Sequence, residues 1–332
     1  MIPTAQFGNL ARFVELGGRF LILGDFDQQT PVYDAWGEQA VLNYRNSDVL
    51  KLMCGHTCFH LTECRRAQGP AAAEHFRRYC SLPAHPEGRV SRSVLQDAEQ
   101  RYPWQGEIPD ITLTLRHSTR ELVATSIADR LAAEIPDDNL KGIFPHPDCA
   151  NGAPMPPHRK MLFWTGQELV GCRRHGASKD HIENGCLYTV TKFDLTSVTV
   201  QLSPSMVPAD RPRPHIVLSD FEAGQLLRYA YARTVSGCQG LTFANKRVLL
   251  LEAHHPRFCK RKLYVAASRC TNPEMFHIAS AEQTRKIIQE CTKDRQLLSS
   301  GEPQYMAELY TQAPQKRAAP VADGKQAKRH KK

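Results

Sequence analysis

Residues 112–135 read TLTLRHSTRELVATSIADRLAAEI, and this stretch decides the fold class. Thr112–Leu115 has the composition of a buried strand, and after it apolar residues recur every four positions from Val123 to Ile135. Ser118 and Glu121 have the spacing of a capping box at the start of that helix. A buried strand followed by an amphipathic helix is the repeating unit of parallel α/β sheets, so we expect an α/β protein.

Further core strands are expected at Phe20–Leu23, Leu226–Tyr231 and Val248–Leu251. The first is an uninterrupted apolar run between Gly17-Gly18 and Gly24-Asp25, which is typical of a buried parallel strand. Open α/β sheets bind ligands at the carboxyl ends of their strands. The loop that begins at Gly24 is therefore a candidate binding loop.

The sequence changes character between residues 136 and 220. Six prolines between 136 and 157 predict an irregular surface segment. Short segments rich in β-formers follow, with a tight-turn signal at Asn184-Gly185. These segments are Met161–Trp164, Leu187–Phe193 and Val198–Leu202. We expect them to form a small antiparallel β-barrel inserted into the α/β fold.

Charge is concentrated at the C-terminus. The chain has 332 residues, a length that suits about two domains. Its formal charge is +9. Its last seventeen residues hold seven lysines and arginines against Asp323, a net +6, so the rest carries +3. The bulk charge therefore indicates a basic tail and says little about whether the folded part binds phosphate.

Eleven cysteines without paired spacing favour free thiols in a reducing, intracellular compartment. The N-terminus lacks the features of a signal peptide, and no stretch approaches the roughly 18 apolar residues of a membrane span. Cysteine and histidine alternate from Cys54 to His60, with Cys64 close behind. Alternation along one strand cannot surround a tetrahedral ion, so we expect no metal site; a zinc-dependent nuclear binder built on this segment is a third, weaker hypothesis.

Three segments follow one order along the chain: Gly24–Gln28 (GDFDQ), Thr234–Gly240 (TVSGCQG) and Tyr264–Arg269 (YVAASR). Together they resemble motifs III, V and VI of superfamily 1 helicases of the RecD-like and Pif-like branch. Members of that branch couple ATP hydrolysis to movement along single-stranded DNA, here with an implied 5′-to-3′ polarity. The chain contains neither a G-x-x-x-x-G-K-[ST] phosphate loop nor an Asp-Glu pair upstream of Gly24, so it corresponds to the downstream two-thirds of such a motor.

The resemblance implies a set of nucleotide-site residues. Gln28 would sense the terminal phosphate of ATP, with Asp25 shaping its turn, and Gln239 and Gly240 would belong to the nucleotide site. His60–Arg66 resembles motif IV, and its Arg66 would reach the γ-phosphate; a solvated surface arginine pair is the alternative. Arg269 would be an arginine finger that reaches across the cleft; a core helix that ends in a solvated arginine is the alternative. The ligands of ATP and Mg²⁺ would lie largely outside this chain.

The resemblance also implies residues that contact DNA. Arg116–Arg120 resembles a segment H-x-x-R that opens a helix of the second domain, which assigns DNA contacts to His117 and Arg120; a strand-end histidine without a ligand is the alternative. In motif V the implied DNA residues are Thr234, Ser236 and Thr242. This motif departs from the usual T-[IV]-H-K-S-Q-G, because serine, glycine and cysteine occupy positions 236 to 238. These departures put the binding of DNA, or the coupling of DNA binding to ATP hydrolysis, in question more than they do the fold.

The resemblance implies RecA-like parallel-sheet domains, of which the first is truncated. We expect a remnant of the first domain at 1–50, the second domain at 51–160 and 221–298, a β-barrel insert at 161–220, and a disordered basic tail at 299–332. Two basic clusters separated by ten residues in that tail resemble a bipartite nuclear import signal. The clusters comprise Lys316, Arg317, Lys328, Arg329, Lys331 and Lys332.

The first functional hypothesis is a nuclear, ATP-dependent DNA helicase that lacks its phosphate-loop segment here. The second is a catalytically inactive nucleic-acid-binding or scaffold module derived from a helicase. Expected partners are single-stranded DNA and a nuclear import receptor, with no membrane. A missing ATP-binding half or another covering partner would protect the open edge of the first domain. The sequence leaves open whether that half is absent through a gene-model error or in the protein itself.

Overall fold

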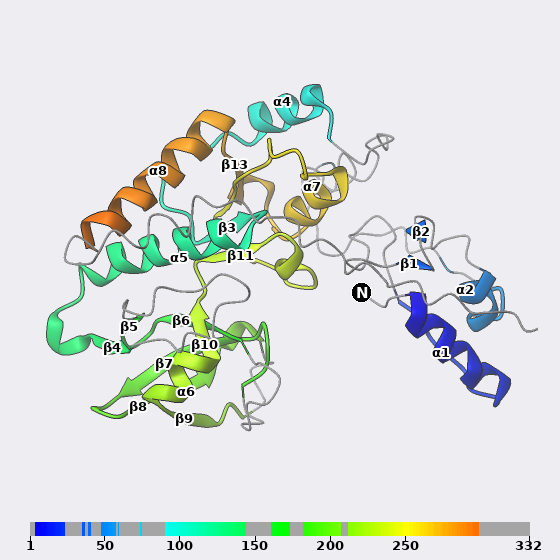
Figure 1. The fold of residues 1–332 in the computed structure, drawn as a ribbon, viewed down its shortest axis with the longest axis horizontal. Coiled ribbons are helices and arrows are strands. Elements are labelled where there is room, and N and C mark those ends of the chain that lie inside the picture. Colours follow the sequence, from blue (N-terminus) through cyan, green and yellow to red (C-terminus); the bar gives the residue numbers. More distant parts are fainter. Residues whose placement is uncertain are drawn as a thin grey trace, which may run out of the picture.

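The computed structural model describes residues 4–23, 35–36, 39–40, 48–57, 59, 74, 90–143, 161–172, 182–206 and 212–298. Figure 1 shows a parallel sheet flanked by helices and, below it, a second sheet that is antiparallel. One continuous apolar core joins helices, parallel strands and antiparallel strands. Within the described residues, no helix is both long and apolar enough to cross a membrane.

The parallel sheet has four strands in the order β11-β3-β12-β13. They are β3 (Ile111–Thr114), β11 (Ala232–Thr234), β12 (Val248–Leu250) and β13 (Phe276–Ile278). All their pairings are parallel, and Leu113 of β3 pairs with a residue of each neighbour. The expected strands at 112–115 and 248–251 are therefore confirmed. The strand expected at Leu226–Tyr231 is split, because its residues end one helix and form a strand of the other sheet.

Helices cover both faces of this sheet. Leu249 shares its core with α5 (His117–Ala132) and α8 (Ala281–Leu298). Its neighbours Val248 and Leu250 share the opposite core with α4 (Arg92–Arg101) and α7 (Lys260–Ala267). Alternating residues of one strand thus bury opposite faces, as in a sheet covered on both sides. The expected α/β class is confirmed.

The start of α5 differs from the prediction. Arg116 is its N-cap, and no side chain of the first turn caps it, so the capping box expected at Ser118 and Glu121 is wrong. The carboxylate of Glu252 accepts hydrogen bonds from the backbone N–H groups of Leu115 and Arg116 instead, at 2.9 and 3.0 Å. A carboxylate from a distant loop thus takes the place of a local cap, which a local sequence pattern cannot reveal.

The second sheet is antiparallel, in the order β10-β6-β7-β8-β9. Its strands are β6 (Glu168–Gly171), β7 (Leu187–Phe193), β8 (Ser197–Leu202), β9 (His215–Ser219) and β10 (Leu227–Tyr229). Helix α6 (Asp220–Leu226) begins with a capping box between Ser219 and Glu222 and contacts both edge strands, β9 and β10. The β-rich insert is therefore present, and its chain re-enters the parallel sheet directly after β10.

A short strand pair lies beside the insert. β4 (Lys141–Ile143) and β5 (Met161–Phe163) pair in antiparallel register. The strand β4 lies within the proline-rich stretch that was expected to be irregular, so that expectation is wrong for these three residues. They form a strand because they lie between Pro136 and Pro145, where no proline removes a backbone donor.

The tight turn expected at Asn184-Gly185 is confirmed. The N–H of Cys186 donates to Glu183 O at 3.3 Å, and Gly185 has a φ of 86°. Gly171 at the end of β6 packs against this turn, since it donates to Cys186 O at 2.9 Å and accepts from the N–H of Gly185 at 2.8 Å. The turn is thus fixed by backbone contacts that leave no room for a side chain at 171.

Gly171→Ala should lower the free energy of unfolding by about 2 kcal/mol, because overpacking against rigid backbone is destabilising. A Cβ at this position would lie 2.2 Å from Glu183 O. The measurement is urea denaturation of the full chain. Gly166→Ala is the comparator, since its φ is +87° but a Cβ there meets nothing within 4 Å. If the two variants lose equal stability, the packing argument for Gly171 is wrong.

The described N-terminal elements are α1 (Thr4–Glu15), β1 (Ala35–Trp36), β2 (Gln39–Ala40) and α2 (Asp48–Met53). The buried parallel strand expected at Phe20–Leu23 is wrong. These residues are irregular, with Leu21 86% and Leu23 80% exposed. A buried strand needs paired neighbours and cover on both faces, and no described strand pairs with 20–23.

Candidate functional site

The candidate site lies at the carboxyl edge of the parallel sheet. Strands β3, β11 and β12 end at Thr114, Thr234 and Leu250 and run in the same direction, so the loops after them meet at one edge (Figure 1). The start of α5 and the short 3-10 helix η4 (Ser236–Cys238) follow two of these strand ends. All five residues predicted to contact DNA lie in the segments that follow these strands or at their ends.

Glu252 organises the start of α5. It follows β12, has a φ of 59° and is only 5% exposed. Besides the two backbone donors of residues 115 and 116, its carboxylate accepts from Arg116 Nε at 2.6 Å and from Thr119 Oγ1 at 2.8 Å. Glu252 was not among the residues predicted from the sequence. Its signal was an acidic side chain directly after the apolar run Val248–Leu251, at the ligand-binding end of a strand.

Thr234 shapes the turn that follows β11. It is buried, and its Oγ1 accepts the N–H of Gly237 at 3.0 Å. The N–H of Val235 donates to Thr114 O at 2.9 Å, which ties this turn to the end of β3. A Cβ at Gly237 would approach Thr234 Oγ1 to 2.9 Å, so glycine fits this turn without adjustment. Thr234 thus positions the loop, whereas Ser236 is exposed.

Arg269 joins the motif V and motif VI segments. Its Nη1 donates to Leu241 O at 3.0 Å, and its backbone O accepts the N–H of Phe243 at 2.7 Å. Its Nε donates to Val265 O at 3.0 Å, and its Nη2 donates to Ser268 Oγ at 2.6 Å. The side chain is 2% exposed. Both edges of its guanidinium therefore hold partners within its own domain, and its role as an arginine finger stays a prediction.

Buried positive charge surrounds the first turn of α5. Burial, followed by the nearby charge of Arg228, lowers the pKa of Arg120 to about 10. Partial desolvation, followed by the charges of Arg120 and Arg228, lowers the pKa of His117 below 6.5. The imidazole is therefore neutral at pH 7, and it gains a positive charge more readily when an anion neutralises these arginines.

The nucleotide-site residues are only partly placed. Asp25, Gln28 and Arg66 lie outside the described residues. Gln239 is half-buried and Gly240 is exposed, with a φ of +87°, directly after η4. No three His, Cys, Asp or Glu side chains of the described part lie together as a metal ion requires. These residues do not fit ATP and Mg²⁺ by themselves, so no chemical step through them follows from the geometry.

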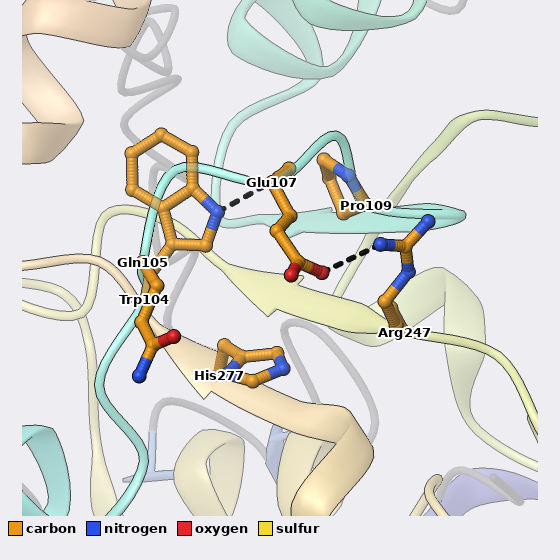
Figure 2. Close-up of a pocket in the computed structure, with 6 residues that line it drawn as sticks. All are labelled: Trp104, Gln105, Glu107, Pro109, Arg247 and His277. Carbon is orange, nitrogen blue, oxygen red and sulfur yellow. Dashed lines mark hydrogen bonds and ion pairs between the residues drawn. The ribbon is translucent and has the colours of Figure 1, made fainter.

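A small hollow of about 60 Å³ lies at the opposite edge of the sheet. Figure 2 shows Glu107 at its centre, accepting from Trp104 Nε1 at its backbone O and pairing with Arg247 through its carboxylate. Its lining comes from the segments that lead into β3 and β12 and from His277 of β13. The volume holds about two water molecules, and the amino ends of parallel strands are not where such sheets bind ligands. This hollow is therefore structural.

Comparisons with known proteins give structural neighbours only. No family model matches the chain, and no curated protein matches its sequence. Among solved structures, Pif1 helicase from Candida albicans has a TM-score of 0.46 and 17% identity, over 81% of this chain and 67% of that one. Bacteroides Pif1 bound to single-stranded DNA has a TM-score of 0.38 and 15% identity, over 74% and 54%.

A third neighbour is Pif1 helicase from Bacteroides in complex with ADP-AlF3 and single-stranded DNA. It has a TM-score of 0.40 and 16% identity, over 73% of this chain and 56% of that one. All three are Pif1 helicases, the branch whose motifs the sequence resembles. This chain spans between 54% and 67% of their lengths.

Proposed function

We propose that this chain binds single-stranded DNA at the carboxyl edge of its parallel sheet, as part of a superfamily 1 DNA helicase. The observation that carries the proposal is the junction of the two motif segments. Residues 241–243, which follow motif V, and Arg269, which ends motif VI, are joined by hydrogen bonds at 2.7 and 3.0 Å. Two patterns found independently in the sequence thus form one unit, and motif V begins at the carboxyl end of β11, where parallel sheets bind ligands.

The exposed groups of this edge support contact with a phosphate backbone. His117 and Ser236 are exposed just after the carboxyl ends of β3 and β11, Thr242 is exposed farther along the segment after β11, and the N-terminus of the 16-residue helix α5 follows the end of β3. Backbone N–H groups at helix N-termini and hydroxyl groups are common phosphate ligands. Such contacts fix a strand in register without reading its bases. The proposal is therefore binding that is tolerant of sequence.

The test is the affinity of the full chain for a fluorescent single-stranded oligonucleotide, measured by anisotropy at several salt concentrations. The basic tail is a competing source of affinity, so the control is a full-length variant with the seven tail lysines and arginines replaced by glutamine. We expect the variant to retain salt-dependent binding, because the folded part makes its own phosphate contacts. Loss of all binding in this variant would contradict the proposal.

A second candidate function is a nucleic-acid-binding module without ATPase activity. The burial of Arg269, with its donors bound to carbonyl and hydroxyl oxygens of its own domain, favours this candidate. Hydrolysis would require the groups proposed at Asp25, Gln28 and Arg66 together with a phosphate loop. We expect the purified chain to show no ATP hydrolysis stimulated by single-stranded DNA. Strong ATP hydrolysis that single-stranded DNA stimulates would exclude a module without ATPase activity.

A reporter fused to residues 310–332 should accumulate in the nucleus. The two basic clusters are separated by Ala318–Ala327, a spacing that suits a receptor with two acidic grooves. The measurement is the nuclear fraction of the reporter, compared with a fusion in which Lys316 and Arg317 are glutamine. Cytoplasmic retention of the unmodified fusion would refute the import signal and leave the DNA proposal untouched.

A further inference from the structure

Three arginines from three elements gather where the parallel sheet joins the insert. Arg120 lies on α5, Arg228 on β10 and Arg233 on β11. Figure 1 shows β10 in the lower sheet and β11 in the upper one, and only residues 230 and 231 separate them along the chain. Arg120 and Arg233 are 5% and 4% exposed, and Arg228 is half-buried. Three guanidinium groups at one junction repel one another.

Burial, more than mutual repulsion, lowers the pKa values of these arginines. Burial, followed by the charge of Arg228, lowers the pKa of Arg233 to about 10. Burial also lowers the pKa of Arg228. A cluster of cations that is removed from water is destabilising unless negative charge neutralises it. The cluster therefore requires negative charge close by.

Arg233 has an open edge. Its Nη1 donates to Gly185 O at 3.2 Å, whereas its Nε and Nη2 are buried and have no hydrogen-bond partner among the described residues. These two nitrogens form the side-on edge of the guanidinium, the fork that meets two oxygens of a phosphate or carboxylate at once. The corresponding edge of Arg269 is bound to Ser268 Oγ and Val265 O. A buried donor pair left open costs free energy unless a ligand completes it.

The acidic groups near the cluster are already engaged. Glu121 pairs with Arg120. Glu168 attracts Arg233, but its carboxylate accepts from Ser203 Oγ at 2.9 Å and pairs with Lys246 Nζ at 2.5 Å. The charge of this carboxylate is therefore shared with a lysine, and neither of its oxygens reaches the open edge of Arg233.

The neighbouring thiols do not supply negative charge either. Burial raises the pKa of Cys238 to about 12, and burial also raises the pKa of Cys186. The thiol of Cys172 donates to Gln225 O at 3.4 Å, an arrangement that requires its proton. The described surroundings thus leave the open edge of Arg233 without an anionic partner.

We propose that Arg233, together with Arg120 and Arg228, forms a phosphate-binding site at the junction between the parallel sheet and the insert. The planar fork of Arg233 contacts two phosphate oxygens, and Arg120 and Arg228 add charge. The site adjoins the exposed start of α5, since His117 lies one turn before Arg120 on that helix. The ligand is a phosphodiester of single-stranded DNA. This choice of phosphate source rests on the proposed function, whereas the recognition of phosphate itself does not.

The test compares the full chain with Arg233→Met by thermal denaturation, in chloride and in pyrophosphate at equal ionic strength. Pyrophosphate should raise the melting temperature of the unmodified chain by about 3 °C or more, since a ligand stabilises the folded state it binds. Arg233→Met should lose this shift. In chloride it should melt at or above the temperature of the unmodified chain, because removing one cation relieves the repulsion.

Two further variants sharpen the result. Arg247→Met removes an arginine that pairs with Glu107 and Asp110 at the other end of the sheet, and it should keep the full response to pyrophosphate. Arg233→Lys keeps the charge but lacks the fork, and its affinity for a single-stranded oligonucleotide should fall about tenfold. This variant keeps the proposal testable if the methionine variant does not fold.

The outcomes separate the two claims. A lower melting temperature of Arg233→Met in chloride, with an unchanged response to pyrophosphate, would show a purely structural arginine and overturn the site. A response to pyrophosphate that depends on Arg233, in a chain that does not bind single-stranded DNA, would support the phosphate site with free pyrophosphate or phosphate as its ligand. The proposed function would then fail by itself. A smaller response to pyrophosphate together with a weaker affinity for the single-stranded oligonucleotide in Arg233→Lys supports the phosphodiester as ligand.

Discussion

Glu252→Ala should lower the free energy of unfolding by about 3 kcal/mol, because its buried carboxylate accepts charge-assisted hydrogen bonds that nothing else replaces. It accepts two backbone N–H groups ahead of α5, the Nε of Arg116 and the hydroxyl of Thr119. Removing it leaves these donors without partners and detaches the start of α5 from the end of β12. The measurement is urea denaturation followed by circular dichroism.

Two controls identify the cause of this loss. Glu107→Ala removes a carboxylate that is 66% exposed and pairs with Arg247, and it should cost less than about 1 kcal/mol. Glu252→Gly removes the same carboxylate but relieves the strain of a φ of 59°, so it should cost about 1 kcal/mol less than the alanine variant. Equal losses for Glu107→Ala and Glu252→Ala would show that the carboxylate of Glu252 does not stabilise α5.

Placing carboxylates at both Ser236 and Thr242 should weaken binding of single-stranded DNA at least about tenfold, since each new charge repels the phosphates at close range. Both side chains are exposed in the segment that follows β11, so Ser236→Glu with Thr242→Glu should leave the melting temperature nearly unchanged. The measurement is oligonucleotide anisotropy at low salt, with the tail lysines and arginines already replaced by glutamine.

A control for net charge is Leu195→Glu, which adds one carboxylate where the double variant adds two. Leu195 is 96% exposed in the turn between β7 and β8, away from the strand ends that form the candidate site. Its carboxylate changes the net charge by one unit without facing the proposed DNA, so the affinity should change less than about threefold. If Leu195→Glu weakens binding as much as the double variant, the effect is one of net charge, and the carboxyl edge is not the binding site.

The predictable part of this fold is the part whose partners are close in sequence. The strand and helix at 111–132 were expected because their periodicity is local, and the turn at Gly185 because glycine tolerates a positive φ. The predicted start of α5 was wrong because its cap, Glu252, is distant in sequence. A remote carboxylate that outcompetes a local pattern is visible only after the chain has folded.

The strand expected at Phe20–Leu23 shows a different failure. An apolar run defines what a segment can bury, but burial as a parallel strand also needs hydrogen-bonding neighbours on both sides. The described strands all pair elsewhere, and Leu21 and Leu23 remain exposed. Periodicity alone therefore cannot distinguish a core strand from an apolar segment without strand partners.

The residues of the candidate site were likewise predictable from the sequence only in part. His117, Ser236 and Thr242 were reachable from the sequence because they belong to recognisable motifs, and all three are exposed in the segments that follow β3 and β11. Their contact with DNA stays a prediction. Arg233 was not reachable, since an arginine within a short strand has no distinguishing pattern. Its significance comes from burial and from the open pair Nε and Nη2, which depend on how β11 packs against the turn at Gly185.

The most direct test of the account is photocrosslinking of the full chain to a single-stranded oligonucleotide with photoreactive bases, followed by mass spectrometry of the crosslinked peptides. The account predicts crosslinks within residues 116–120 and 233–242, and their loss when excess unlabelled oligonucleotide competes. Crosslinks confined to residues 316–332 would show that the basic tail alone holds the DNA and would contradict the central claim.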